Sequence, residues 1–419
     1  MKKIALILFS LLALFACTED NTLKDPVFNL SELPADDPAV ALPSGGITGV
    51  TLKWDEPWSA TSTQEWLTIS PSEGMAGKHT ITLVSERNED FSAREAELIV
   101  QSASATGSLA IRQNPNIYRK TYLGSRKVHW SFSWVYDESS GLARSRLVMP
   151  YPETTEYQGV RDRTYSETAK LKTSPEGVNY LLDDRSSSFP ASGQPFIWQD
   201  FTVDYYDVRV DFSVIEDEDI PYDTASSSYK RYTIQIRDDD DTFMIDPKDS
   251  RIVNTSSALW EEAGGKRIEY ARLCHKWIIE NITYGIYDGP NDINHILERM
   301  SGDCGNQHAV WMSLMRAAGI PARPIVMKAP DPDGYSHVRA EFYLPGYGWI
   351  PVDPTNEQGS HEDYFGAFKY EPLVVMNRDF GFTGWDASGK FCIGMLQGLS
   401  VGVWGRGPFD GKEEFIFTD

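Results

Sequence analysis

The chain has 419 residues, a length typical of roughly two to four domains, and enough apolar residues for buried cores. Its formal net charge of −22 argues against a nucleic-acid partner, which would need a basic surface. The acidic excess mainly indicates a soluble surface.

The first 17 residues have the pattern of an export signal. Two lysines precede the apolar run IALILFSLLALFA, which is too short to span a membrane. The run ends in LFAC at Cys17 and resembles a bacterial lipobox. The resemblance implies a signal peptide over residues 1–17, a lipid anchor on Cys17, and an exported lipoprotein at the outer membrane or cell surface of a Gram-negative bacterium. The alternative is an ordinary cleaved signal with a chance cysteine.

Residues 18–45 are rich in Pro, Asp and Ser and are interpreted as a linker. In residues 46–115, short runs alternate apolar with polar residues between turn residues, which predicts a small β-sandwich. The segment WLTISP and the closing IRQ resemble a BACON domain, a module for which carbohydrate or mucin binding is proposed. Three aromatic residues could stack on sugar rings, although rings in so small a sandwich more often fill the core: Trp54, Trp58 and Trp66.

Residues 116–250 predict a second β-rich domain. Runs such as KVHWSFSWVYD and TVDYYDVRVDFSVIED alternate clearly, with loops between them. The acidic run Asp238–Asp241 within this region raises the question of a calcium site. Four consecutive carboxylates point in several directions and lack calcium-loop spacing, so a solvated turn is favoured.

Three cysteines follow Cys17 in the chain. Cys274 lies in a helical pattern over residues 258–281 and is expected to be a small buried hydrophobe. A disulfide between Cys274 and Cys392 would leave Cys304 free, and this pairing stays open. A further short helix is expected over residues 292–300. The glycine-rich tail after residue 373 could add strands to the core or cover a cleft.

The stretch GDCGNQHAVWMSLMRAAGIPAR predicts a tight turn and then a helix over residues 304–318. Gly319 supplies a left-handed stop, and the proline after it prevents continuation. Cys304 therefore lies at a helix N-terminus, where unpaired N–H groups and the dipole favour a thiolate. His337 and Asp353 follow on later strand-like runs, in the order of an acyl-transfer triad.

This stretch, together with WIIENITY and SHVRAEFYLPGYGWIPVDPT, resembles the bacterial transglutaminase-like superfamily over about residues 251–370. The resemblance implies a papain-like α+β domain in residues 251–419 and a triad of Cys304, His337 and Asp353. The phrases RLVMPYP and TFMIDPKDSRIV resemble the β-sandwich accessory domain of bacterial relatives. The expected fold is therefore multidomain, with two N-terminal all-β sandwich domains followed by an α+β papain-like (transglutaminase-like) domain.

In this triad His337 would stabilise the Cys304 thiolate and later protonate the leaving amine. Asp353 would accept from the other ring nitrogen and hold the tautomer, whereas Asp303 is locked beside the nucleophile. The Cys304 N–H is the natural first oxyanion donor. The second donor is unassigned, and two weak candidates are Tyr284 and Tyr287.

His308 lies four residues after Cys304, so the two could share a helix face as zinc ligands. Because no nearby Cys or His completes a ligand set, His308 is instead expected to line the cleft or support the triad. No metal and no cofactor are expected.

The leading hypothesis is a surface-anchored, cysteine-dependent amide hydrolase or acyltransferase that acts on peptides or glycopeptides through a thioester. Hydrolysis is favoured, because water competes with an amine unless the cleft excludes it. The alternatives are a non-enzymatic surface binding or scaffold lipoprotein with glycan- or mucin-binding β modules, and a calcium-activated cross-linker. Val338-Arg339 follow His337 where many family members have an aromatic residue, which bears on substrate preference.

Overall fold

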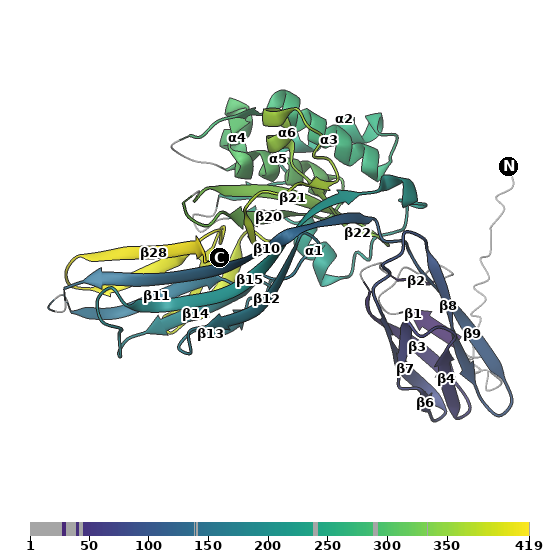
Figure 1. Cartoon of the computed structure of the whole chain (residues 1–419). Helices are drawn as coiled ribbons and strands as arrows, with labels where there is room; N and C mark the ends of the chain where they lie inside the picture. The colour runs from purple at the N-terminus through teal and green to yellow at the C-terminus, as the bar shows by residue number, and fades with distance from the viewer. Residues whose placement is uncertain are drawn as a thin grey trace, which may run out of the picture. The chain divides into compact units, whose positions relative to one another are not determined.

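The computed structural model describes residues 27–30, 39–41, 45–137, 139, 141–237, 242–287, 292–332 and 334–418. Cys17, the expected signal peptide and the acidic run Asp238–Asp241 lie outside these residues. The described chain is multidomain and mostly β, with an α+β region toward the C-terminus, which confirms the predicted fold class (Figure 1). It divides into two compact units, one mainly of residues before Gln113 and one mainly of the residues from there on.

The N-terminal unit is a β-sandwich with sheet orders β1-β3-β7-β5 and β2-β9-β8-β4-β6. Trp54, Trp58 and Trp66 are 1%, 3% and 8% exposed and lie in its core, so they cannot stack on a sugar as they stand. Its strands are β1 (Val27–Leu30), β2 (Ala39–Ala41), β3 (Gly46–Trp54), β4 (Trp58–Ser62), β5 (Leu67–Ser70), β6 (Glu73–Gly74), β7 (Gly77–Ser85), β8 (Arg94–Gln101) and β9 (Thr106–Gln113).

The linker predicted over residues 18–45 differs from the structure, because β1 and β2 lie within it. β1 pairs antiparallel with β3, with Val27 opposite Lys53, and β2 lies next to β9. Both short stretches sit at sheet edges, where otherwise unpaired N–H and C=O groups gain partners.

A second β-sandwich is built around two long antiparallel strands, β10 (Tyr118–Tyr136) and β15 (Pro195–Val210). Its sheet orders are β12-β15-β10-β28 and β13-β14-β11-β27. The rings of Trp130 and Phe415 pack 4.7 Å apart in its core. The other strands are β11 (Leu142–Pro150), β12 (Gln158–Tyr165), β13 (Lys170–Thr173), β14 (Asn179–Arg185), β27 (Ser400–Gly405) and β28 (Phe409–Phe417).

The last two strands, β27 and β28, pair with this sandwich, although the α+β domain was expected to extend over residues 251–419. β28 pairs with β10, with Phe415 opposite Trp130, and β27 pairs with β11 (yellow in Figure 1). Without them β10 and β11 would be sheet edges, and apolar residues of the tail complete the core. The tail also forms the hairpin β25 (Phe382–Asp386) to β26 (Gly389–Ile393).

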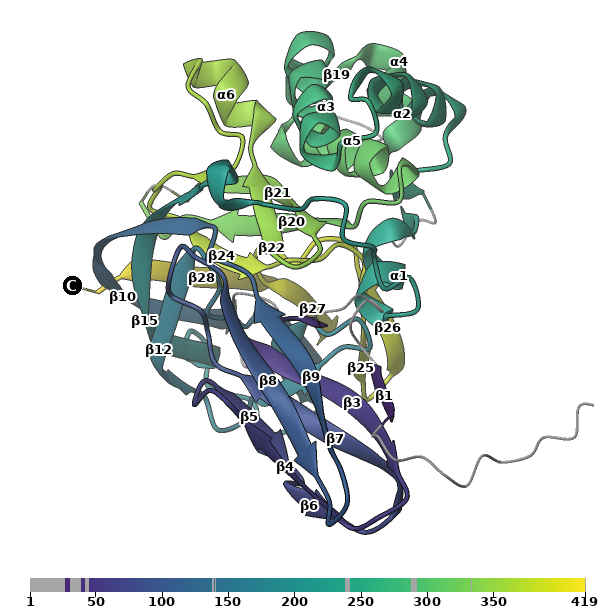
Figure 2. The ribbon, with the colours of Figure 1, turned by 90° about the vertical axis from the view of Figure 1, so that its right-hand side faces the viewer.

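The α+β region is an antiparallel sheet of order β22-β21-β20-β24 with helices packed on it (Figures 1 and 2). Helix α5 contacts β20 and β21, and α2, α3, α4 and α6 pack around α5. The strands are β20 (Ala322–Lys328), β21 (Ser336–Leu344), β22 (Gly348–Val352) and β24 (Val374–Asn377). The helices are α2 (Ser250–Glu262), α3 (Arg267–Asn281), α4 (Ile293–Arg299), α5 (Cys304–Ala317) and α6 (Pro354–Ser360).

Short elements connect these layers. They are η2 (Phe212–Val214), α1 (Ser227–Thr233), β16 (Ile236–Arg237), β17 (Phe243–Ile245), β18 (Thr283–Tyr284), β19 (Ser301–Gly302) and β23 (Ala367–Phe368). β18 pairs in parallel with β19, so the chain reaches α5 on a fixed backbone path.

The predicted helix over residues 258–281 is two helices. α2 ends at Glu262, and the chain turns through Gly264 and Gly265, whose φ angles are 61° and 74°. Such left-handed angles favour glycine, so this pair breaks the helical pattern. The helices predicted over residues 292–300 and 304–318 are confirmed as α4 and α5.

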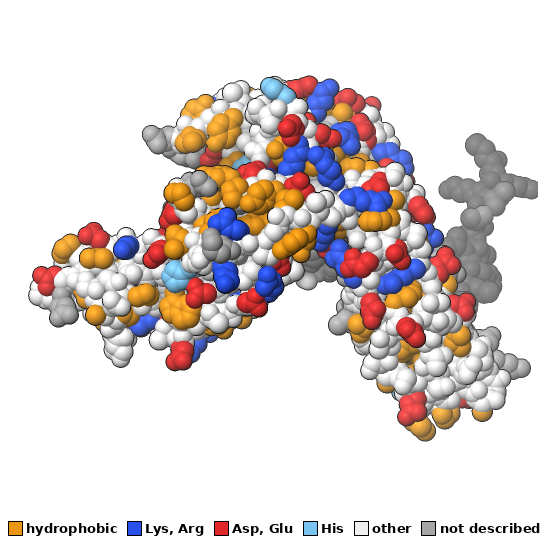
Figure 3. Space-filling model, viewed as in Figure 1, with side chains coloured by type: hydrophobic (Ala, Val, Ile, Leu, Met, Phe, Trp, Pro, Cys, Tyr) orange, Lys and Arg blue, Asp and Glu red, His pale blue; other side chains and the backbone are white. Residues whose placement is uncertain are grey.

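The surface carries charges of both signs. On the face shown in Figure 3, acidic and basic side chains are intermixed over the helices and the sandwich. Among the residues that the structure describes, none of the helices has the length and apolar character required to cross a bilayer.

Candidate active site

Cys304 is the first residue of α5 and is partly exposed. The helix start is held by a capping box, in which the Asn306 N–H donates to the Asp303 side chain at 2.9 Å and Asn306 Oδ1 accepts from the Asp303 N–H. A Cβ atom at Gly302 would overlap the Asn306 side chain, so glycine permits the close approach before the helix. The local sequence thus fixes the cysteine at the positive end of a buried helix.

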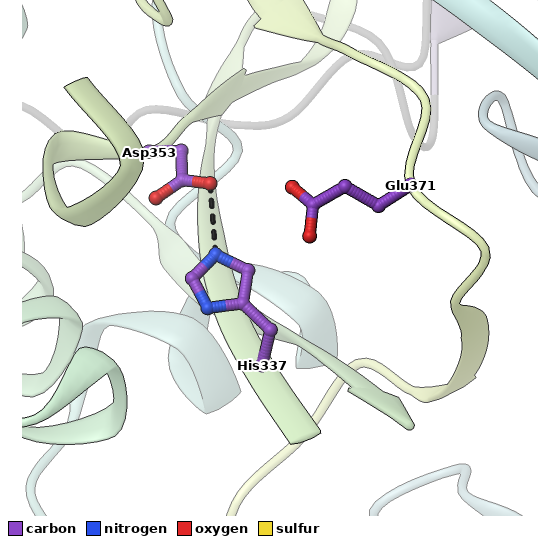
Figure 4. Close-up of side chains that lie close together, drawn as sticks. All are labelled: His337, Asp353 and Glu371. Atoms are coloured by element: carbon purple, nitrogen blue, oxygen red, sulfur yellow. Dashed lines mark hydrogen bonds and ion pairs between the residues drawn. The ribbon is translucent and has the colours of Figure 1, made fainter. Parts of the chain in front are cut away.

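His337 and Asp353 come from neighbouring strands of the sheet. His337 lies near the start of β21, and Asp353 directly follows β22 and caps α6 by accepting from the Asn356 N–H at 3.0 Å. His337 Nε2 donates to Asp353 Oδ2 at 2.9 Å (Figure 4). The Cys304 side chain also interacts with His337 and favours its protonated form. His337 and Asp353 are therefore joined directly, and Nδ1 is the ring nitrogen left for the sulfur of Cys304.

The charges of this arrangement reinforce one another. Burial opposes a charge on His337, but the Asp353 carboxylate and the neighbouring Cys304 side chain outweigh it and raise the pKa of His337 to about 10. Burial likewise opposes a charge on Asp353, yet His337 and Arg339 hold the pKa of this carboxyl far below its usual value. The geometry therefore favours an imidazolium beside the sulfur and an ionised carboxylate behind it.

His308 supports the start of α5. Its side chain is fully buried, and Nδ1–H donates to the Cys304 carbonyl oxygen at 2.7 Å. Its Nε2 lies 3.8 Å from Asp353 Oδ1, beyond hydrogen-bonding distance. Burial lowers the pKa of His308 to about 4, so this ring is neutral near pH 7. His308 therefore lies behind the cysteine and the aspartate rather than facing solvent.

A buried amide network fixes α5 against its neighbours. Gln307 is fully buried, and its Nε2 donates to the Ile282 carbonyl oxygen at 2.7 Å. Its Oε1 accepts from Thr355 of α6 at 2.6 Å. Nothing in the sequence pattern distinguished this glutamine from a surface residue.

A charged pair beside the triad was not predicted from the sequence. Arg339, on β21, lies with its Nε 2.8 Å from Asp353 Oδ2, and its guanidinium pairs with Glu371. Arg339 follows His337 by two residues, a spacing that places both side chains on one face of a strand and could have indicated the contact. Glu371 lies in a loop, and no local pattern identifies it.

Three side chains at the triad could in principle bind a metal ion. Atoms of His337, Asp353 and Glu371 lie within 4.8 Å of one another, and Figure 4 shows the two carboxylates facing the same region. The Arg339 guanidinium pairs with both carboxylates and already supplies the positive charge there. The donor set therefore fits the Arg339 side chain better than a metal ion.

The two candidates for the second oxyanion donor have different surroundings. The Tyr287 hydroxyl donates to Ser301 Oγ at 2.8 Å, so its proton is already engaged. Tyr284 is half-exposed, and burial together with the nearby Cys304 and Asp303 raises its pKa. Tyr284 is thus the candidate that interacts with the cysteine.

All three cysteines of the described chain are free. Cys274 is fully buried in α3, as predicted, and Cys392 is exposed on β26. The disulfide between these two residues, which the sequence left open, is not formed in the structure.

Part of the tail lies against the strand that carries His337. Gln397 Nε2 donates to the carbonyl oxygens of His337 at 3.1 Å and Met327 at 2.9 Å. β24 adds a strand to the sheet beside β20. The tail therefore braces the backbone of the site.

Two parts of the chain match known families. Residues 258–354 match the model of the transglutaminase-like superfamily, and residues 56–114 match BACON, described as "Putative binding domain, N-terminal". The chain has a BACON domain followed by a transglutaminase-like domain. These matches confirm the two resemblances predicted from the sequence. The transglutaminase-like domain supports a cysteine-dependent hydrolase or transferase.

Individual proteins show more limited similarity. An "Uncharacterized protein" of Haemophilus influenzae is 33% identical over 21% of this chain and 32% of its own length, so the chain spans about a third of that relative. The structure of a "Putative Cysteine Protease" from Cytophaga hutchinsonii has a TM-score of 0.45 and 16% identity, over 72% of this chain and 93% of that one. The structure of a "putative protease" from Parabacteroides distasonis has a TM-score of 0.22 and 9% identity, over 80% of this chain and 70% of that one.

Proposed function

We propose that the transglutaminase-like domain is an amide hydrolase or acyltransferase that acts through a thioester on Cys304. The observation that carries the proposal is the hydrogen bond from His337 to Asp353, together with the interaction of His337 with the side chain of Cys304 at a capped helix start. Nucleophile, base and orienting group are each within reach of the next.

The first half of the reaction uses the Cys304 thiolate and the His337 imidazolium. The Cys304 thiolate attacks the carbonyl carbon of an amide, and the carbonyl oxygen takes up negative charge beside the Cys304 N–H, a donor that the helix cannot satisfy itself. His337, as the imidazolium, gives its proton to the amide nitrogen. The carbon–nitrogen bond then breaks, the amine leaves, and the acyl group remains on sulfur as a thioester.

The second half returns the enzyme to its starting state. A water attacks the thioester carbon while the neutral His337 takes one of its protons, and the sulfur leaves as the thiolate. The product is a carboxylic acid, and the imidazolium is restored. Where an amine attacks in place of water, the same steps give a new amide. Hydrolysis is the favoured outcome, because Cys304 is partly exposed to solvent.

Peptides or glycopeptides are the proposed substrates. Exposed apolar and aromatic side chains lie on the segment that precedes α4, and Tyr284 of this segment interacts with Cys304. Ile286 is 80% exposed, so it is available to a substrate side chain. Such a surface suits contact with an extended chain next to the amide to be cleaved.

The proposal extends to the site of action. If Cys17 carries a lipid, the domain acts at the cell surface or outer membrane, and the membrane is contacted through that anchor. Globomycin-sensitive processing and loss of membrane association in Cys17→Ala would support this. An unprocessed or fully released wild-type protein would contradict it.

The enzymatic proposal is tested with peptide and glycopeptide libraries. The wild type should release new amines or form new amides, and Cys304→Ala should not. Cys392→Ala is the matched control, since it removes an exposed thiol elsewhere in the same chain and should keep full activity. Full amidase activity in purified Cys304→Ala would show that the nucleophile is misassigned.

A further inference from the structure

A buried arginine links the triad carboxylate to a second carboxylate. The Arg339 side chain is 1% exposed, and its Nε lies 2.8 Å from Asp353 Oδ2, the same oxygen that accepts from His337. A terminal nitrogen of the guanidinium pairs with Glu371 Oε1. Nη1 also donates to the Lys369 carbonyl oxygen at 3.0 Å, which fixes the plane of the group.

Glu371 is itself held in place. Asn356 Nδ2 donates to Glu371 Oε1 at 2.6 Å, and the Tyr335 hydroxyl donates to Oε2 at 3.2 Å. The central carbon of the Arg339 guanidinium lies 4.4 Å from the centre of the Phe368 ring. The result is a fixed row of alternating charges that runs from the His337 imidazolium through Asp353 and Arg339 to Glu371.

The order of these charges determines which of them stabilise the protonated form of His337. Asp353 stabilises the protonated ring, and Arg339, a permanent cation beside the same carboxylate oxygen, weakens that stabilisation. Glu371 offsets part of the Arg339 charge. The other groups that face His337 are Cys304 and His308, both from α5, and neither touches Glu371 in the part of the chain that the structure describes.

We propose that the Arg339–Glu371 pair sets the pH range over which His337 keeps its proton. Arg339 is a positioning residue in this scheme, since it acts on the histidine through Asp353. The inference rests on the proposed function, because it concerns the regulation of the same site. A purely structural salt bridge would stabilise the fold equally well but would not move the titration of His337 in a charge-dependent direction.

The test reads the charge on His337 without a substrate. Cys304 is alkylated with iodoacetate, which is anionic, and with iodoacetamide, which is neutral, from about pH 6 to about pH 11. Attraction to the imidazolium favours iodoacetate, so the rate ratio at Cys304 falls as His337 loses its proton. The same ratio at the exposed Cys392, measured on its own peptide, is the internal reference.

The two charges of the pair should shift the midpoint in opposite directions. Glu371→Gln keeps an acceptor for Arg339 but removes the negative charge, so the midpoint should fall by about one pH unit. Arg339→Met removes the positive charge, so the midpoint should rise by about the same amount. Arg339→Lys keeps the charge and should stay near the wild type.

Arg323→Met is the matched control, because Arg323 forms a buried pair with Glu341 at 2.6 Å and has no contact with Asp353 among the described residues. Its midpoint should equal that of the wild type. If Arg339→Met does not fold, Glu371→Gln alone tests the inference, because this change is nearly isosteric. Its midpoint should move toward neutral pH. Unchanged midpoints, or shifts of the same sign in both variants, would overturn the inference.

The outcomes separate this inference from the proposed function. If Cys304 of the wild type reacts no faster than Cys392 at neutral pH, the proposed nucleophile fails, and with it the basis of the inference. If Cys304 reacts fast but Glu371→Gln titrates as the wild type, only the role of the pair fails.

Discussion

Raising the pH should destabilise the α+β region by discharging His337. In the folded protein burial opposes the charge on this ring, but Asp353 outweighs burial and raises the pKa of His337 from 6.5 to about 10. A group whose pKa is raised by folding contributes its full stability below the unfolded value and loses it as the pH rises through the folded value. The contribution should therefore be complete at about pH 6 and absent at about pH 11.

The size of the effect follows from this interval. One pKa unit corresponds to about 1.4 kcal/mol, so the rise to about 10 is equivalent to up to about 5 kcal/mol of unfolding free energy. His337→Gln keeps a hydrogen-bond donor for Asp353 but carries no titratable charge. The stability of the wild type should therefore exceed that of His337→Gln at about pH 6, and the difference should shrink by a few kcal/mol toward about pH 11.

The assay must report on this region alone. Cys274 is fully buried in α3, so it becomes reactive only when the helices open. Samples equilibrated in urea at each pH would receive a brief pulse of excess alkylating reagent at one fixed pH, and the Cys274 peptide would be quantified by mass spectrometry. A difference between the two proteins that stays constant with pH would refute a charged His337 paired with Asp353.

Three further predictions concern other parts of the chain. Gly302→Ala should abolish the fast reaction of Cys304 with iodoacetamide, because a Cβ there would overlap Asn306 in the helix cap. Gly359→Ala is the control and should leave this reaction unchanged, since no atom lies within 4 Å of the added carbon. Trp54→Ala should destabilise the N-terminal unit by about 3–5 kcal/mol in thermal unfolding, because this ring is 1% exposed in the core, and a small effect would contradict that placement. Activity should be unchanged by a chelator, since Arg339 already pairs with Asp353 and Glu371; chelator-sensitive turnover would show that a metal is required.

Local signals in the sequence were sufficient to predict helix α5. The signals that begin and end α5 lie within a few residues of it. They are Gly302, Gly319 and the capping side chains. His337 and Asp353 were found because each belongs to a long motif that resembles a family. The signal for the break between α2 and α3 is equally local, because it is the pair Gly264 and Gly265. A single helix was nevertheless predicted there.

The rest depended on contacts between distant parts of the chain. Phe415 pairs opposite Trp130, and no periodicity within the tail indicates which edge strand it will join. Glu371 meets Arg339 because a loop returns to the end of β22, a path that its neighbours in sequence do not encode. The partner strands of β27 and β28, and the meeting of Glu371 with Arg339, were therefore out of reach of sequence reasoning.

The alkylation of Cys304 near neutral pH tests the central claim most directly. The rate for iodoacetamide at Cys304 would be compared with that at the exposed Cys392 of the same molecule, in the wild type and in His337→Ala. A poised thiolate should react at least about tenfold faster than an ordinary thiol, and the advantage should be lost without His337. Equal rates at the two cysteines, or an advantage that survives in His337→Ala, would contradict the catalytic pair.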